Sequence, residues 1–295
     1  MKTEKASFET YLKQQGFTKS SIKTRLAVIG CYLKWLEKQG LQAEEVTYND
    51  LLIYIKHSQR KGVSQRTVQS YLGTIKHYYD HLIREGKTTV NPAEDIKIKG
   101  VKRKTLYHIF EPHELHQLYN SYKDESLIGK RNKVMLGLLI YQGLKTEELA
   151  KLETTDIKLR EGKIEVPGGR RSNHRTMNLE SHQVLEMYDY ILQARPEILM
   201  ESGQQTDKLF ISLTGKESTI SNLTNSFIKP LKAQNKNLLN TKQIRASVIT
   251  KWLKQYNLRE TQYLAGHRYI STTEGYKQND MEGLVEEVNM FHPLG

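Results

Sequence analysis

Residues 242–276 read KQIRASVITKWLKQYNLRETQYLAGHRYISTTEGY, and this stretch decides the fold of the end of the chain. Its first part repeats apolar residues at helical spacing: Ile244, Val248, Ile249, Trp252 and Leu253. Arg245 is therefore predicted to lie on a helix whose other face is buried. A second, short helix is expected from about Arg259 to Gly266, because glycine tolerates the left-handed conformation that ends many helices. His267 would then lie just past a helix end.

A third helix boundary places Tyr276. Ser271 is followed three residues later by Glu274, which is the capping-box pattern, so a new helix is predicted to begin there and to carry Tyr276 on its second turn. A guanidinium, an imidazole and a phenol are thus fixed within 32 residues. They suit phosphoryl transfer, because a phenolate can attack a phosphodiester while Arg and His donate to its oxygens. Each could instead serve the fold alone, as a helix cap, a buried polar group and a core ring.

The composition indicates a polyanionic partner. The 295 residues include 45 Lys and Arg against 33 Asp and Glu, a formal net charge of +12 at pH 7. No apolar stretch approaches the length of a transmembrane helix, so DNA or RNA suits this charge better than a membrane. Residues 1–105 hold 20 Lys and Arg against 10 Asp and Glu, whereas residues 106–295 hold 25 against 23. This asymmetry in charge suggests a DNA-binding domain joined to a domain with a different function.

Cysteine usage and missing cofactor motifs narrow the class of protein. The sequence has no Cys/His cluster at metal-ligand spacing and no phosphate-binding glycine loop, so no metal and no nucleotide cofactor are expected. It opens with charged and polar residues, which argues against a signal peptide. A single cysteine excludes a disulfide scaffold and favours the reducing cytoplasm. Cys31 lies within an apolar helical pattern and is expected to be a small core residue.

Residues 1–96 are predicted to form a bundle of helices, around residues 8–12, 22–36, 51–62 and 64–86. Ser20 or Ser21 is expected to cap the second helix, and Gly40 to end it. Basic residues off the apolar stripes are predicted to follow DNA phosphates: Lys19, Lys23, Arg60, Lys61, Arg66 and Lys76. Each alone could be a solvated charge. Residues 97–105 form a basic linker whose Lys102, Arg103 and Lys104 are expected to add contacts to DNA.

Residues 106–295 are predicted to mix helices with a small sheet. A helix opens at Pro112, and another, around residues 134–141, is apolar nearly all round and is expected to be central. Short strands are expected at residues 157–159, 164–166 and 176–179, and further helices at residues 183–193, 220–231 and 281–291. The last of these helices follows a polar hinge and could pack on its own subunit or on a neighbouring one.

The second signature box of the tyrosine recombinases (the phage integrase family, with its Xer-like members) closely resembles four elements of this sequence: Arg245, Ala265–Gly266–His267, Ser271–Thr272–Thr273 and Tyr276. The resemblance implies a SAM-like, core-binding helical bundle followed by an α+β catalytic domain, mainly α overall with a small sheet. It implies that Tyr276 attacks DNA to form a 3′-phosphotyrosyl link while Arg245 and His267 stabilise the transition state. It also implies double-stranded DNA as the substrate, a homotetrameric synaptic complex, and neither ATP nor a metal.

Three positions depart from the family's active-site pattern. Lys145 stands where the first signature box has arginine, whereas Glu148 matches its acidic supporting residue. Lys242 occupies the histidine position of the His-x-x-Arg motif, and Arg170 aligns, with one residue of slack, with the strand-loop lysine. Each substitution keeps or adds positive charge, so the pocket would still attract a phosphate. The geometry differs, because an ammonium at position 145 cannot offer the planar fork of a guanidinium.

Two interpretations of these substitutions stay open. A recombinase that integrates or excises a mobile element could have redistributed its catalytic roles, with Lys145 or Lys242 giving a proton to the leaving oxygen. A catalytically impaired relative could instead act as a sequence-specific DNA-binding regulator. Topoisomerase-like nicking and resealing is a further activity for the same fold. The intact Tyr276 favours the recombinase, and all of these functions predict a cytoplasmic protein associated with the bacterial nucleoid.

Overall fold

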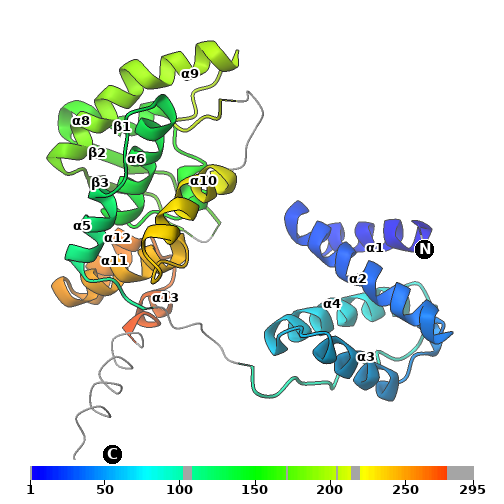
Figure 1. Ribbon diagram of the computed structural model, residues 1–295. Helices are drawn as coiled ribbons and strands as arrows, with labels where there is room; N and C mark the ends of the chain where they lie inside the picture. The colour runs from blue at the N-terminus through cyan, green and yellow to red at the C-terminus, as the bar shows by residue number, and fades with distance from the viewer. Residues whose placement is uncertain (1, 102–107, 171, 204, 214–219, 278–295) are drawn as a thin grey trace, which may run out of the picture. The chain divides into compact units, whose positions relative to one another are not determined.

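The chain forms two compact units, Met1–Thr105 and Leu106–Gly295, each with its own hydrophobic core (Figure 1). The computed structural model describes residues 2–101, 108–170, 172–203, 205–213 and 220–277. Helices dominate these residues, and a three-stranded sheet belongs to the second unit, which confirms the predicted fold class. Lys102, Arg103, Lys104 and the expected tail helix at residues 281–291 lie outside the described residues.

The first unit is a bundle of helices, as predicted. Its described helices are α1 (Lys2–Gln14), α2 (Lys19–Gln39), α3 (Tyr48–Arg60) and α4 (Gln65–Arg84), with a 3-10 turn at Ala43–Glu45. Thr18 caps α2, because its hydroxyl accepts a hydrogen bond from the backbone N–H of Ser21 at 3.3 Å. The predicted caps Ser20 and Ser21 are wrong, since both already lie inside the first helical turn. Gly40 ends α2 with a φ of 68°, as expected.

A pair of tyrosines joins three elements of the first core. The hydroxyls of Tyr32 in α2 and Tyr79 in α4 lie 2.8 Å apart, and Tyr79 donates to the carbonyl oxygen of Ala43 at 3.1 Å. The core continues beyond α4 through Ala93 and Ile96, which are both buried. The segment that follows α4 is therefore held by the same hydrophobic core as the helices.

Cys31 is exposed, so its predicted place in the core is wrong. It lies two residues from both Ile29 and Leu33, which are buried. Two residues correspond to roughly 200° around an α-helix, so the thiol faces away from the apolar stripe of α2.

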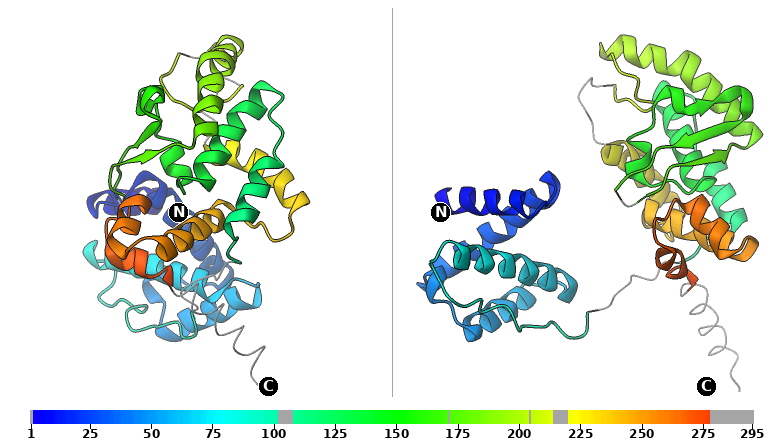
Figure 2. Two further views of the ribbon diagram at one scale, coloured as in Figure 1. Left: turned by 90° about the vertical axis from the view of Figure 1, so that its left-hand side faces the viewer. Right: turned by 180° about the vertical axis from the view of Figure 1, so that it is seen from behind.

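The second unit combines helices with a short antiparallel sheet. The sheet has the order β1-β2-β3, from β1 (Ile157–Lys158), β2 (Lys163–Val166) and β3 (Arg175–Asn178), and Val166 pairs with Arg175. The described helices are α5 (Pro112–Asn120), α6 (Leu127–Ile140), α7 (Thr146–Leu149), α8 (Ser181–Asp189), α9 (Arg195–Ser202), α10 (Ile220–Gln234), α11 (Thr241–Gln255), α12 (Leu258–Ala265) and α13 (Ile270–Glu274). The last three pack against one another at one end of this unit (Figure 2).

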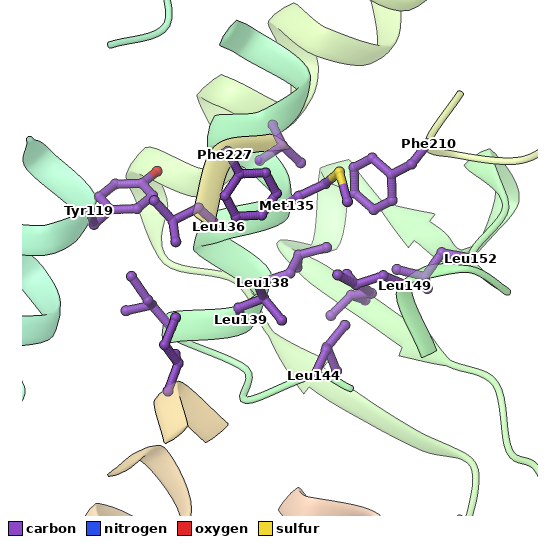
Figure 3. Packing of buried hydrophobic residues seen from close by; sticks show 14 of the residues in the cluster. Tyr119, Met135, Leu136, Leu138, Leu139, Leu144, Leu149, Leu152, Phe210 and Phe227 are labelled. Carbon is purple, nitrogen blue, oxygen red and sulfur yellow. The ribbon is translucent and has the colours of Figure 1, made fainter. Parts of the chain in front are cut away.

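Helix α6 is the centre of the second core, as its all-round apolar pattern predicts. Met135, Leu136, Leu138 and Leu139 are fully buried, and Phe227 of α10 packs among them (Figure 3). The helix predicted at residues 183–193 is instead α8, which continues through a π-turn at Tyr190–Ala194 into α9. Pro196 lies in the first turn of α9, directly after the π-helical turn.

The region around Tyr276 differs from the prediction. Helix α13 begins at Ile270 with Tyr269 as its N-cap residue, so Ser271 lies inside the helix and does not cap it. Tyr276 follows the end of α13 instead of lying on its second turn, and its N–H donates to the carbonyl oxygen of Thr273 at 3.0 Å. The reason is tertiary: Thr273 is fully buried, and its hydroxyl is paired with His267.

Candidate active site

Arg245 lies on α11, as predicted, with only 5% of its surface exposed. Helix α11 is capped by Asn240, whose side chain accepts from Gln243 N at 3.0 Å, and this fixes the turn that carries Arg245. The guanidinium donates through Nη1 to the carbonyl oxygen of Gly143 and through Nη2 to that of Ala265. Arg245 therefore ties α11 both to the loop after α6 and to the end of α12.

His267 is the second member of the site and is held on both ring nitrogens. Its Nε2 lies 3.2 Å from Nη2 of Arg245, and its Nδ1 lies 2.9 Å from Oγ1 of Thr273. Because a guanidinium can only donate, Nε2 is the acceptor and Nδ1 carries the proton. Burial, together with the positive charges of Arg245 and Lys145, lowers the pKa of His267 to about 3. The imidazole is therefore neutral near pH 7.

Gly266 makes the turn that delivers His267. It ends α12 with a φ of 61°, which confirms the predicted helix end. A Cβ atom at this position would lie 2.3 Å from Nη1 of Arg175, so glycine is required for space as well as for conformation. The backbone N–H of His267 then donates to the carbonyl oxygen of Gln262 at 3.0 Å.

Tyr276 completes the trio that the sequence predicts. Its ring stacks on the imidazole of His267, with centroids 5.7 Å apart and planes at 15°. Its phenol also interacts with the Arg245 guanidinium. A candidate nucleophile, an imidazole and a buried cation are thus in direct contact, although they come from three different elements.

Glu148 links the cations of the site. It is 3% exposed and accepts from Nη1 and Nη2 of Arg175, both at 3.0 Å. Its Oε2 also accepts from the backbone N–H of Lys145 at 2.9 Å and lies 3.8 Å from Nη1 of Arg245. Burial raises the pKa of this carboxyl, but the hydrogen bonds and charge of Arg175 outweigh it and hold the pKa below its usual range. Glu148 is therefore ionised and orients its three basic neighbours.

Arg175 is a residue of the site that the sequence did not predict, since its stretch served only to align a strand. It is 1% exposed and is the largest of the fully buried side chains. The signal lies in the strand alternation, because Arg175 and Met177 share the inward face of β3. A charged residue at such a position requires a buried partner, and here the partner is Glu148.

A pocket of about 650 Å³ opens beside the trio. Its lining residues are Lys145, Arg170, His267, Arg268, Tyr269, Thr272 and Tyr276. Burial and the neighbouring charge of Arg245 lower the pKa of the Lys145 ammonium. Three basic side chains around one cavity fit an anion, and a phosphate group matches both the charge and the nearby phenol. Arg268 and Tyr269 were not predicted, because nothing in their local pattern distinguishes them from a surface turn. Thr272 was named only as part of the family's signature box.

Comparisons with known proteins agree with this geometry. The model of the phage integrase family matches residues 108–282, which is more than half of the chain, and that of the phage integrase N-terminal SAM-like domain matches residues 6–86. The chain belongs to the phage integrase family of tyrosine recombinases.

Xer-type recombinases are among its relatives. Tyrosine recombinase XerC of Bacillus licheniformis is 23% identical over 291 residues, which cover 97% of this chain and 95% of the relative. XerC of Lactobacillus leichmannii is 27% identical over 263 residues, or 88% of each chain. Among solved structures, a lambda integrase dimer bound to a COC′ core site has a TM-score of 0.69 at 14% identity, covering 95% of this chain and 77% of the integrase. That likeness shows a shared fold.

The other residues expected in a recombinase site differ in their placement. Arg170 lines the pocket, on the loop between β2 and β3. Lys242 is exposed on the first turn of α11 and is not one of the lining residues. In the first unit, Lys19, Lys23, Arg60, Lys61 and Arg66 are exposed. Lys76 is only half-exposed, and its ammonium donates to the carbonyl oxygen of Glu94, so this lysine supports the fold.

Two further features of this family member concern membranes and metals. Among the described residues, none of the helices is long and apolar enough to cross a bilayer. In the same residues, no three His, Cys, Asp or Glu side chains come together as a possible metal site.

Proposed function

We propose that this chain is a site-specific DNA recombinase that breaks and rejoins DNA through a 3′-phosphotyrosyl intermediate. The observation that carries this proposal is the contact of Tyr276 with both His267 and Arg245 at the edge of a basic pocket. The phenol is the nucleophile, and the pocket is large and positive enough to hold the scissile phosphate.

In the cleavage step, Oη of Tyr276 bonds to phosphorus while the bond from phosphorus to the 5′-oxygen breaks. The phenol gives its proton to Nε2 of His267, which is unprotonated in the free site and gives up its hydrogen bond from Nη2 of Arg245 to take the proton. A bound phosphate offsets the positive charge that lowers the pKa of His267 and so makes this nitrogen more basic. Resealing is the same reaction in reverse with a new 5′-hydroxyl. Because the phosphotyrosyl bond keeps the energy of the broken one, the chemistry needs neither ATP nor a metal.

Lys145 is the proton donor that this site offers to the leaving oxygen. It lines the pocket, and its pKa is lowered by burial and by Arg245, so its proton is more readily transferred than that of an ordinary lysine. Arg170 also lines the pocket, but a guanidinium is always protonated and is a poor proton donor. Arg245, held near Glu148, supplies charge to the pentavalent transition state.

The first unit supports the DNA-binding part of the proposal. Its exposed basic residues, together with Lys102, Arg103 and Lys104 at the end of its sequence, supply the positive charge that a DNA backbone requires. A lambda integrase tetramer bound to a Holliday junction and the Tn1549 transposon integrase in complex with circular intermediate DNA share this fold. By analogy, we extend the proposal to a homotetrameric synaptic complex and to the integration or excision of a mobile element.

The test is a suicide DNA substrate, nicked beside the cleavage site, on which a covalent protein–DNA adduct accumulates. Wild type should form the adduct, and Tyr276→Phe should bind the DNA without forming it. Tyr269→Phe is the matched control, because it removes the other phenol that lines the pocket and should leave the adduct intact. Adduct formation by Tyr276→Phe at the wild-type level would remove Tyr276 from this role. Binding without any wild-type adduct would instead favour a sequence-specific DNA-binding regulator.

A further inference from the structure

The hydrogen-bond donors of Arg245 are almost all used within the protein. Both Nη2 hydrogens have acceptors, in the carbonyl oxygen of Ala265 and in Nε2 of His267. Nη1 donates to the carbonyl oxygen of Gly143, and the guanidinium also interacts with the phenol of Tyr276. The buried Nε has no acceptor among the described residues. Transfer of the Tyr276 proton to Nε2 of His267 would release only one of these donors, the Nη2 hydrogen that Nε2 had accepted. Since a guanidinium has five N–H donors, Arg245 then retains little capacity to bind two phosphate oxygens at once.

The scissile phosphate therefore needs hydrogen-bond donors from residues other than Arg245. As Tyr276 attacks, negative charge grows on the non-bridging oxygens of the phosphate, and donors placed there stabilise the transition state. Lys145 offers a compact ammonium and cannot bind two oxygens as a planar fork does. A second guanidinium, with donors that face the pocket, would meet this demand.

Arg268 is in a position to supply this second guanidinium. Its side chain is exposed and lines the same pocket as Lys145 and Tyr276. Its Nη1 donates to the carbonyl oxygen of Arg170 at 3.0 Å, which uses one of its five donors. This is the only protein acceptor that the described residues give it.

The backbone beneath Arg268 is also fixed. Ser172 forms an isolated β-bridge with His267, and Asn173 N donates to the carbonyl oxygen of Gly266 at 3.1 Å. The loop that carries Arg170 and the turn that carries Arg268 are therefore joined. An arginine held in this way loses less conformational freedom on binding an anion than a free surface arginine does.

We propose that Arg268 is a further catalytic residue, whose guanidinium donates to a non-bridging oxygen of the scissile phosphate and supplies the fork that Lys145 lacks. The inference rests on the proposed recombinase function. It adds a residue directly after His267 to the group that touches the reacting phosphate.

The experiment compares two suicide substrates, one with a normal scissile phosphate and one with a methylphosphonate, in which an uncharged methyl replaces a non-bridging oxygen. On the phosphate, Arg268→Ala should slow adduct formation by about 10²-fold relative to wild type, the usual effect of losing one such donor. On the methylphosphonate, the ratio of wild-type to variant rate should be at least about tenfold smaller, because the charge that Arg268 neutralises is absent. Arg268→Lys should lie between Arg268→Ala and wild type on the phosphate.

Arg259→Ala is the matched control, since Arg259 is an exposed arginine of α12 whose side chain bonds only to Gln262 among the described residues and does not line the pocket. It should cleave both substrates like wild type. An Arg268→Ala variant as fast as wild type on the phosphate would overturn the inference. An equal loss on both substrates would also overturn it, because Arg268 would then act only by holding the Arg170 loop. Both results leave a wild-type adduct, so they are distinct from failure of the recombinase function, in which wild type forms none.

Discussion

The guanidinium of Arg175 and the carboxylate of Glu148 form a bidentate ion pair, with both N–O distances at 3.0 Å and each side chain at most 3% exposed. Taking two charges out of water is costly, and their mutual attraction compensates only when the geometry is good. Here Glu148 also binds the backbone of Lys145 and lies near Arg245. The pair therefore determines where the cations of the site lie.

Removing Arg175 should destabilise the second unit strongly. We expect Arg175→Met to lower the free energy of unfolding by about 3–5 kcal/mol, because it leaves Glu148 buried without its partner. Urea unfolding can be followed by the fluorescence of Trp252 in a Trp35→Phe background, since these are the chain's two tryptophans. Arg160→Met, at an exposed arginine, should stay within about 0.5 kcal/mol of the parent.

Adding Glu148→Gln to Arg175→Met should restore part of this stability, since the stranded charge is then removed. A double variant no more stable than Arg175→Met would show that the effect comes from poorer packing and not from the ion pair.

Gly266 should be far more sensitive to substitution than another glycine of the same conformation. Gly266→Ala meets both an unfavourable φ of 61° and the Arg175 guanidinium, whereas Gly203→Ala, at a φ of 64°, meets no atom within 4 Å. Gly203→Ala should therefore cost only about 1–2 kcal/mol for the left-handed backbone. Gly266→Ala should cost more and should also slow adduct formation. Equal costs at the two sites would mean that Arg175 moves aside freely.

His267 should make the stability of the second unit depend on pH. Its pKa is about 3 in the folded chain and 6.5 in the unfolded one, so between these values only the unfolded chain binds the proton. The free energy of unfolding therefore falls by about 1.4 kcal/mol per pH unit as the pH drops through this window. His267→Asn lacks this contribution, so the stability difference between wild type and variant should shrink by about 2–3 kcal/mol from pH 6 to pH 4. A constant difference across this range would contradict the neutral imidazole.

Lys145 should be the general acid, and sulfur substitution can test it. Replacing the leaving 5′-oxygen by sulfur removes the need for a proton, so Lys145→Ala should lose about 10²–10⁴-fold on the oxygen substrate and recover on the sulfur substrate. Lys242→Ala should cleave both substrates normally, because Lys242 is exposed and outside the pocket lining. Rescue of Lys242→Ala, with none for Lys145→Ala, would reverse the assignment.

The first unit should supply most of the non-specific affinity for DNA. Changing Lys19, Lys23 and Arg66 to Gln in the full chain should reduce the slope of log K against log salt concentration by about 0.9 for each phosphate that is no longer neutralised. Lys123, Lys229 and Lys236 are exposed lysines of the second unit and form the matched control set. A larger change of slope from the control set would show that the second unit contributes most of the non-specific affinity for DNA.

Local signals predicted much of the site. The apolar period of α11, the glycine at the end of α12 and the spacing to Tyr276 placed the trio within one stretch of sequence. The helices and short strands could be predicted in the same way, because hydrophobic periodicity and turn residues are local properties of the sequence. Such signals depend only on residues that are close together in the sequence.

Contacts between distant residues were not predictable in this way. Arg175 and Glu148 are 27 positions apart, and nothing in the sequence indicates that they pair, although the resemblance named Glu148 as a supporting residue. The capping pattern at Ser271 was overridden because Thr273 turns its hydroxyl to His267. Arg268 gained its place only when the Arg170 loop paired with the turn at His267.

The hydrophobic cores of the two units have no residue in common among the residues described. Each can therefore accept substitutions without repacking the other. Under the proposed recombinase function, substitutions in the first unit would alter DNA binding and leave the active site of the second unit unchanged. Hybrid chains joined near residue 105, with the first unit of one recombinase and the second of another, would be a direct way to redirect where this reaction occurs.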